Sequence, residues 1–314
     1  MTRLLLGRLG RMVPLLLLIT LGAFSLVLLL PGDPAVTLAG DNPTPDQIER
    51  IREVMGLDRP IYAQYVDWLA GVIRGDFGES LYSGAQVTDL IMQRLPVTAW
   101  LTVFAISIAI TVGVPAGIYA AARRGSWVDR ALTVFMSVGI AVPAFWLGLV
   151  LITVFAVNLG VFPAGGYVPI SDGAGEWFLG LALPAATLAA APAAELARHT
   201  RSAMITVLEQ DYVRTARSKG TRERVVLFKH ALKNAASPVV TILSFQIAFM
   251  LGGSAIVEQI FGLPGMGSLA IQAVYEKDFP ILQGVVVVAA LIVMIINLLT
   301  DALYGWLNPK VRAL

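Results

Sequence analysis

The chain has 314 residues, of which 57% are hydrophobic and only 14% are charged, and its mean hydropathy is +0.75. Soluble domains contain about 25% charged residues, so this composition indicates a membrane protein and excludes an ordinary globular domain. The formal net charge is +2 and the chain has no cysteine, which excludes disulfides, thiol catalysis and cysteine-based metal sites.

Six apolar stretches reach the length of about 20 residues that a transmembrane helix needs. Backbone at membrane depth must satisfy its own hydrogen bonds, so the sequence predicts an all-α fold with six transmembrane helices. In chain order, the predicted spans are residues 12–30, 97–122, 131–157, 177–194, 234–257 and 279–300. The fourth is the weakest prediction, because it is short and contains Pro184 and Pro192.

The first span has the basic leader of a secretory signal peptide, with Arg3, Arg8 and Arg11 before the apolar run. The run is longer than the apolar core of such a peptide, and no clear small-x-small cleavage site follows it. We therefore expect a first helix that is retained.

The segment 31–93 after the first span is predicted to be a small structured region outside the membrane core. Turn and cap residues predict a helix over 44–55, which Gly56 ends, and an amphipathic helix over 61–73. Its aromatic residues suit a membrane interface or packing on the helix ends. A cap over the spans is the favoured interpretation, and contact with an external partner is the alternative.

The basic residues are distributed unequally between the two sides of the membrane. With a cytoplasmic N-terminus, 17 of the 23 Lys and Arg residues fall on the cytoplasmic side. They lie in four segments, residues 3–11, 123–130, 198–233 and 310–312. Because short cytoplasmic loops accumulate Lys and Arg, both termini of this multi-pass chain are predicted to face the cytoplasm.

A charged segment, residues 209–233, lies between the fourth and fifth predicted spans and reads EQDYVRTARSKGTRERVVLFKHALK. Its composition predicts two short helices that meet at Gly220. Val225, Val226 and Phe228 add apolar side chains to this basic segment. A few apolar anchors ringed by charge are typical of a docking surface. The alternative is a solvated basic loop that only sets the topology.

The sequence contains no motif for enzymatic chemistry. It lacks a P-loop, HExxH, GxSxG and paired carboxylates within the spans, so it predicts neither nucleotide binding nor catalysis on this chain. His199 and His230 are isolated residues of the charged region and are interpreted as surface or capping residues rather than ligands. No metal, cofactor or nucleic acid is expected to bind to this chain.

Carboxylates of the spans lie only at span edges, at Glu195, Glu258 and Asp301. Glu195 can pair with Arg198 or meet His199 one helical turn later, which is typical of a charge that anchors a helix end. A bilayer centre without charge argues against a carrier that powers itself with an ion gradient.

A candidate outer gate follows the fifth span. Glu258 is flanked by apolar residues, and Phe261 and Pro264 lie just after it, before the end of a GLPGMG turn. Ordinary packing at the rim of the span is the alternative interpretation of these residues.

The charged segment carries a family resemblance. Residues 211–220, DYVRTARSKG, and residues 230–235, HALKNA, resemble the EAA loop of ABC importer permeases, within them the dipeptide, oligopeptide and nickel branch. Arg214-Thr215-Ala216 occupies the Glu-Ala-Ala positions of the general pattern, and Gly220 occupies its glycine. Other segments similar to that family are residues 30–34, 56–60, 75–80, 94–98, 143–146 and 258–267.

The resemblance implies a type I ABC importer permease fold and a division of the chain into three regions. These are the tail and first helix (1–30), an extracytoplasmic loop region (31–93) and a five-helix permease core (94–314) that contains the coupling segment 209–233. The resemblance also implies which residues couple the chain to an ATPase. They are Asp211, Arg214, Thr215, Ala216, Arg217, Lys219, Gly220, Val225 and Phe228.

The partners implied by the resemblance are a second similar permease, two ATPase subunits that bind ATP and magnesium, and an extracytoplasmic binding protein that delivers a peptide. ATP-driven closure of the ATPases would move the spans as rigid bodies and open the path alternately to each side. Two alternatives stay open at this point: a carrier driven by an ion gradient, and an importer of the same class for nickel, glutathione or haem.

Overall fold

The structure is a computed structural model that describes residues 2–29, 34–39, 43–54 and 56–307. Within these ranges the chain is helical, and the one β pairing is an isolated antiparallel bridge between Glu79 and Gln86. The all-α prediction is therefore confirmed. The chain divides into a first unit, Met1–Leu5, Thr98–Leu263 and Ile295–Leu314, and a second unit, Leu6–Val97 and Pro264–Met294.

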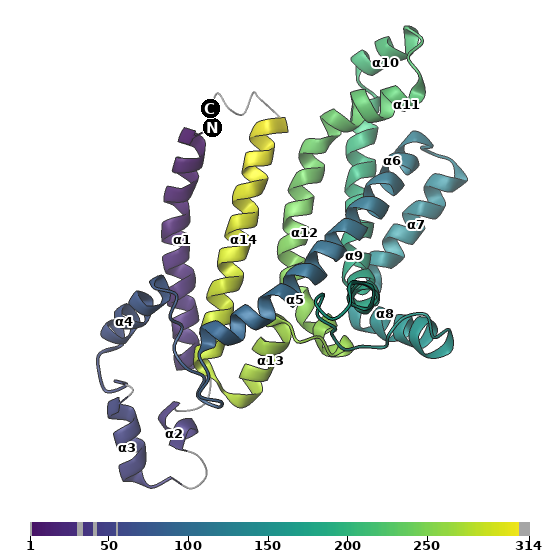
Figure 1. The fold of residues 1–314 in the computed structure, drawn as a ribbon. Helices are drawn as coiled ribbons and strands as arrows, with labels where there is room; N and C mark the ends of the chain where they lie inside the picture. Colours follow the sequence, from purple (N-terminus) through teal and green to yellow (C-terminus); the bar gives the residue numbers. More distant parts are fainter. Residues whose placement is uncertain (1, 30–33, 40–42, 55, 308–314) are drawn as a thin grey trace. The chain divides into compact units, whose positions relative to one another are not determined.

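The helices of the first unit follow one another along the chain. Some α-helices are joined by π-helical turns, in which each hydrogen bond connects residues five positions apart. These elements include the second half of α5 (Val87–Ile108), η1 (Ala109–Gly113), α6 (Val114–Ala122), α7 (Trp127–Ala141), α8 (Ala144–Leu151), η2 (Ile152–Asn158), α9 (Ala174–Leu208), α10 (Asp211–Ser218), α11 (Glu223–Val225), η3 (Val226–Ala231) and α12 (Leu232–Phe261) (Figure 1).

The helix α9 is the centre of the first unit and packs against α6, α7, α8 and α12. Its middle part is rich in alanine, and small residues let membrane helices approach closely. A Cβ atom added at Gly113 would lie 2.6 Å from the carbonyl oxygen of Ala193, and one at Gly117 would lie 2.5 Å from that of Ala197. These two glycines therefore set how closely η1 and α6 approach α9.

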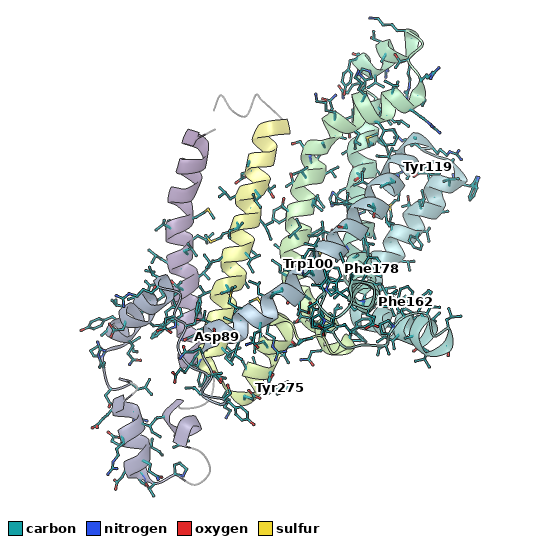
Figure 2. All side chains as sticks on the ribbon, viewed as in Figure 1. Asp89, Trp100, Tyr119, Phe162, Phe178 and Tyr275 are labelled. Carbon is teal, nitrogen blue, oxygen red and sulfur yellow. The ribbon has the colours of Figure 1, made fainter. Side chains whose placement is uncertain are left out.

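An aromatic cluster joins α5 to the first turns of α9. The rings of Trp100 and Trp177 are 5.3 Å apart between centroids, and Phe104 lies 5.1 Å from Trp177 and 5.6 Å from Phe178. Figure 2 labels Trp100 and Phe178 on the two helices. Edge-to-face pairs of this kind add about 0.5–1.5 kcal/mol each beyond the area that they bury.

The predicted spans correspond to helices that extend beyond the apolar runs. The second span lies within a continuous helical segment, Val87–Ala122, because the charged residues before position 97 stay helical. The fourth lies within α9, a single helix of 35 residues that continues through Pro184 and Pro192. Neighbouring helices stabilise such helices, so proline does not have to end them.

The third predicted span is not one straight helix. Its two halves, α7 and α8, are bent by 102° at Val142 and Pro143. Val142 has extended backbone, with ψ at 123°, because a proline disfavours the helical conformation of the residue before it. The prediction of a continuous helix over 131–157 is therefore wrong at this point, and the pair is a broken span or a re-entrant loop.

Four helices of the described ranges are long and apolar enough to cross a membrane, or up to five if the bent pair counts as one span. The first predicted span lies in α1 (Thr2–Leu29), which supplies a shorter apolar stretch over Met12–Ser25. Leu30, the last residue of that predicted span, lies outside the described residues.

The second unit contains the short helices of the first half of the chain and the helical corner near its end. Its elements are α1, α2 (Pro34–Ala39), α3 (Pro45–Val54), α4 (Ile61–Ile73), the start of α5, α13 (Met266–Glu276) and most of α14 (Phe279–Leu307). Two of them, α3 and α4, agree with the helices predicted over 44–55 and 61–73, and Met55 lies outside the described residues. Neither α2 nor α13 was predicted from the sequence.

Aromatic residues join α4 to α1 within the second unit. The ring of Phe24 lies 5.6 Å from that of Tyr65 and 5.7 Å from that of Trp68. The hydroxyl groups of Thr20 and Tyr65 are 2.9 Å apart and form a hydrogen bond. Tyr65 and Trp68, two of the aromatic residues predicted to suit a membrane interface or packing on helix ends, thus pack on a helix, whereas Tyr62 is exposed.

A buried carboxylate fastens the turn before α5 to the corner between α13 and α14. Asp278 is fully buried and accepts hydrogen bonds from the Ser80 hydroxyl at 2.5 Å and from the Tyr82 N–H at 3.3 Å. It also accepts from the N–H of Ile281, in the first turn of α14, at 3.4 Å. Three donors from two distant parts of the chain thus satisfy one buried charge.

Replacement of Asp278 by alanine is expected to lower the free energy of unfolding by about 3 kcal/mol, because three donors would lose a charged acceptor in a buried place. The thermal unfolding midpoint of the purified protein in detergent measures this effect. Asp58→Ala is the control, because Asp58 is an exposed carboxylate of the same unit. Equal midpoints for the two variants would contradict the structural role of Asp278.

Lys277 ends α13 in a left-handed conformation, with φ at 57°, and is the one residue other than glycine with positive φ in the described ranges. Glycine adopts this conformation without the steric cost that a Cβ atom adds. Lys277→Gly is therefore expected to stabilise the protein by about 1 kcal/mol in the same thermal measurement. A lower unfolding midpoint would show that the stabilisation from the lysine side chain exceeds the cost of its left-handed backbone.

Candidate functional site

The segment between α9 and α12, residues 209–233 and here called the docking segment, folds as two short helices joined at a glycine. The first helix, α10, ends at Ser218, and the next helical residue is Glu223. Between them Gly220 has φ at 74°, which is left-handed backbone that side-chain-bearing residues rarely adopt. The predicted break at Gly220 is confirmed.

An ion pair connects the two helices across this turn. The guanidinium of Arg217 donates to both carboxylate oxygens of Glu223, over distances of 3.2 and 2.7 Å. The hydrogen bond to Glu223 raises the pKa of Arg217 above its ordinary value. Since these side chains are 43% and 54% exposed, the pair adds little to stability, but its two parallel bonds orient α10 relative to α11.

Apolar side chains fasten the docking segment to the first unit. Val213 of α10 and Val226 of η3 are fully buried. Ala231, the last residue of η3, packs in a buried cluster with Met204 of α9 and Ile118 of α6. The sequence analysis did not include Val213 among its site residues, although it is the one aliphatic residue larger than alanine in the helix DYVRTARS.

Most of the predicted coupling residues lie on the exposed side of the docking segment. Phe228 is 58% exposed and Val225 is 38% exposed, although both are apolar. Exposed side chains are also found at Asp211, Arg214, Thr215, Arg217 and Lys219, whereas Ala216 is half-buried. The structure thus brings apolar and basic groups together on one short, solvent-facing segment, as the sequence predicted.

Polar contacts also connect the docking segment to its neighbours. Arg124, at the turn between α6 and α7, forms an ion pair with Glu209. The Asn234 amide at the start of α12 donates a hydrogen bond to the Tyr212 hydroxyl over 3.0 Å. Neither contact was predicted from the sequence, because each joins residues that are far apart in the chain.

A second ion pair supports the base of the segment. The guanidinium of Arg201, in α9, donates to both oxygens of Asp129, at the start of α7, over 2.6 and 2.8 Å. Asp129 also accepts from the Gly125 N–H at 3.0 Å. This pair was not predicted either, and it fixes the turn between α6 and α7 against the part of α9 that leads into the docking segment.

Glu195 has the partner that the sequence suggested and one more. Its carboxylate lies 3.3 Å from the guanidinium of Arg198 and accepts a hydrogen bond from the Gln246 amide of α12 at 2.5 Å. The pairing with Arg198 is confirmed. The bond to Gln246 joins α9 to α12, so Glu195 does more than anchor the end of its own helix.

The candidate gate residues lie in two different environments. Glu258 is fully buried and accepts a hydrogen bond from the Thr98 hydroxyl over 2.7 Å. Phe261 is 1% exposed, and its carbonyl accepts from the Gly166 N–H at 2.8 Å. Pro264 belongs to the second unit and is half-buried. The structure thus describes Glu258 and Phe261 as packed inside the first unit, and their role as a gate stays a prediction.

Two family models match the chain and together cover most of it. Residues 113–313 match the binding-protein-dependent transport system inner membrane component, and residues 1–102 match the N-terminal region of the same kind of protein. The chain is 41% identical to the oligopeptide transport system permease protein AppB of Bacillus subtilis (strain 168) over 303 residues, 96% of each chain. It is 42% identical to the glutathione transport system permease protein GsiC of Escherichia coli (strain K12) over 306 residues, 97% of each chain.

A solved structure supports the fold. The inward-facing MetNI methionine ABC transporter has a chain that matches with a TM-score of 0.58 at 17% identity, covering 70% of this chain and 96% of that one. At this identity the likeness shows the type I importer fold alone. The chain belongs to the family of binding-protein-dependent transport system inner membrane components, the multi-pass membrane permeases, not enzymes, that work with ATPase subunits and a substrate-binding protein in ABC importers.

Proposed function

We propose that this chain carries short peptides across the cytoplasmic membrane and that separate ATPase subunits drive it through the docking segment. The observation that carries the proposal is the exposed Phe228 beside Val225 on a basic helical segment that is fastened from below by buried valines. A rigid segment with unpartnered apolar groups is suited to a protein partner. Since the sequence has no nucleotide-binding motif, ATP would be bound and hydrolysed by such a partner and not by this chain.

The proposed partner contacts follow the residues of the docking segment. Phe228 and Val225 would enter an apolar recess of the ATPase, while the surrounding basic side chains steer and orient it. The exposed basic residues available for this are Arg214, Arg217 and Lys219. One ATPase subunit would dock on this chain and another on a second, similar permease, with the solute path between the two permeases.

The proposed arrangement in the membrane follows from charge. The docking segment and both termini would face the cytoplasm, since 17 of the 23 basic residues then lie on that side. Region 1–30 would be the tail and first helix, region 31–93 would receive the binding protein outside, and region 94–314 would form the core. The gate that we assign to Glu258, Phe261 and Pro264 would then lie at the outer end of the core.

The proposed substrate class rests on the names of the relatives. One is an oligopeptide permease and the other a glutathione permease, and glutathione is itself a tripeptide. Identities of 41% and 42% over nearly complete chains support a solute of similar size and polarity. A short peptide is therefore the proposed cargo.

Reconstitution in liposomes tests this function. The chain alone is expected to show neither ATP hydrolysis nor peptide uptake, whereas the importer assembled with its second permease, ATPases and binding protein should take up labelled peptide only with ATP. Uptake by the chain alone in an imposed proton or sodium gradient would overturn the proposal. Identification of the ligand that the purified binding protein retains would decide between peptides, glutathione, nickel and haem.

A further inference from the structure

The second unit contains a cavity that the proposed transport mechanism does not use. Its volume is about 680 Å³, and its wall includes Trp68, Asp76, Glu79, Pro280 and Gln283. The volume lies within the range of about 300–1,000 Å³ that is usual for sites of small molecules. The wall joins the turn before α5 to the first turn and a half of α14, both of which Asp278 holds in place.

An amide in this wall has no hydrogen-bond partner. Gln283 is 5% exposed and lines the cavity, and its side chain makes no hydrogen bond to any residue that the structure describes. The buried Nε1 of Trp68, in the same wall, also has no partner in the described ranges, and a buried donor of this kind costs about 1–3 kcal/mol. An amide that lines a cavity is satisfied when a polar ligand occupies that cavity.

Two carboxylates in the same wall lack a countercharge. Asp76 accepts one hydrogen bond, from a backbone N–H at 2.9 Å, and Glu79 accepts one from the Gln86 amide at 2.8 Å. Each of these bonds uses one oxygen of its carboxylate, and neither residue has an ion-pair partner in the described part of the chain. The third carboxylate of the wall, Asp67, is instead paired with Arg59 at 2.5 Å.

The chemistry of the wall selects an organic cation. Among the described residues no group of three or more His, Asp or Glu side chains could hold a metal ion. A primary ammonium group has three donors, which suits carboxylate oxygens and the carbonyl oxygen of an amide, and the indole of Trp68 offers an aromatic face for a cation. The NH₂ group of Gln283 is then free to donate to a carbonyl next to the ammonium group.

We propose that this cavity binds the N-terminal ammonium group of a short peptide, with Asp76 and Glu79 as the charged partners and Gln283 as the amide partner. The proposal rests on the proposed function, because it names a place where the cargo is bound on this chain. It adds a requirement that peptide transport by itself does not make: the permease itself recognises a free amino terminus of the cargo.

The test measures binding of trialanine by isothermal titration calorimetry to the assembled permease and ATPase complex in nanodiscs, without ATP and without binding protein. Glu79→Gln removes the charge but keeps an oxygen for the bond from Gln86, and Gln283→Leu removes the amide at similar volume. Each is expected to weaken trialanine binding about tenfold or more, the effect of losing a charge-assisted or otherwise buried hydrogen bond. N-acetyl-trialanine, which has no ammonium group, is expected to bind to the wild type as weakly as trialanine binds to the variants.

Matched controls separate binding from folding. Asp58→Asn removes one negative charge from the same unit at an exposed residue that does not line the cavity, and it should bind trialanine like the wild type. Gln283→Leu should unfold at the same temperature as the wild type or higher, since the side chain is 5% exposed and its amide has no hydrogen bond to lose. A lower affinity with unchanged unfolding supports the site.

Equal affinity of the wild type for trialanine and N-acetyl-trialanine, or unchanged affinity in both variants, would overturn the proposal. ATP-driven uptake of trialanine by the complete importer, measured in parallel, distinguishes the two ideas. Uptake without any binding in the titration would overturn the cavity site and leave peptide transport standing. If Glu79→Gln instead weakened only the association of the binding protein, the cavity would receive a lysine of that protein, and the peptide assignment would be wrong.

Discussion

A chain in which alanine replaces Gly117 is expected not to accumulate as a folded membrane protein. The added Cβ atom would lie 2.5 Å from the carbonyl oxygen of Ala197 and 2.6 Å from the Cβ atom of Thr200. Both are rigid parts of α9, so no rotation of a side chain relieves the clash, and α6 would have to move away from the central helix. Overpacking of this kind costs about 3 kcal/mol, a large part of the stability of a typical protein.

The control for this variant is Gly252→Ala, in α12. No atom lies within 4 Å of a Cβ atom added at Gly252, so alanine there should only favour the helix, by about 0.5–1 kcal/mol. Size-exclusion profiles and thermal unfolding of the two variants in detergent compare them directly. Equal yield and equal unfolding temperature would contradict the close packing of α6 on α9.

Replacement of Gly220 by proline is expected to reduce ATP-driven uptake at least tenfold while the protein still inserts into the membrane. Proline requires φ near −65°, whereas Gly220 has φ at 74°, and proline also removes the N–H that bonds to the Arg217 carbonyl at 2.9 Å. The turn between α10 and α11 would open and displace the apolar groups that we assign to the ATPase contact. Uptake and ATP hydrolysis by the reconstituted importer are measured. We expect hydrolysis that is no longer coupled to uptake.

Gly220→Asn is the matched variant, because asparagine tolerates left-handed backbone and a Cβ atom at this position meets no atom within 4 Å. It should keep at least half of the uptake. Reversal of charge at Arg217 together with Lys219 is a second disruption, which changes the basic surface and also breaks the Arg217–Glu223 ion pair across the same turn. Wild-type coupling in the proline and charge-reversed variants would count against the docking segment as the site of ATPase contact.

The apolar runs predicted most of the membrane helices because length and hydropathy are local properties of the chain. The effect of proline on the helices was the part of these predictions that was inaccurate. Pro184 and Pro192 weakened the prediction of the fourth span, yet α9 continues through both. Pro143 lies within the third predicted span, 131–157, which was predicted as a single span, yet the chain bends by 102° beside it. The neighbouring helices α6, α7, α8 and α12 stabilise α9 in the first case, and their positions are not encoded locally.

The docking segment shows the same limit at the level of single residues. Its exposed residues, such as Phe228, stand out in the sequence because an apolar side chain among charges is unusual. The residues that anchor the segment do not stand out in the sequence, since Val213 is buried only by packing against other parts of the fold. Contacts between residues far apart in the chain were also beyond prediction, such as the bond of 2.5 Å from Ser80 to Asp278.

The π-helical turn η3, which leads from α11 within the docking segment into α12, has a geometric consequence. A π turn contains one residue more than an α-helical turn, and each residue of an α-helix advances by about 100° around the axis. A helical wheel drawn straight through from Glu223 to Phe261 therefore misassigns sides by about that angle across Val226–Ala231. Since the chain has no native cysteine, engineered cysteine pairs could map an ATPase contact without background, provided that their positions are chosen with this angular offset included.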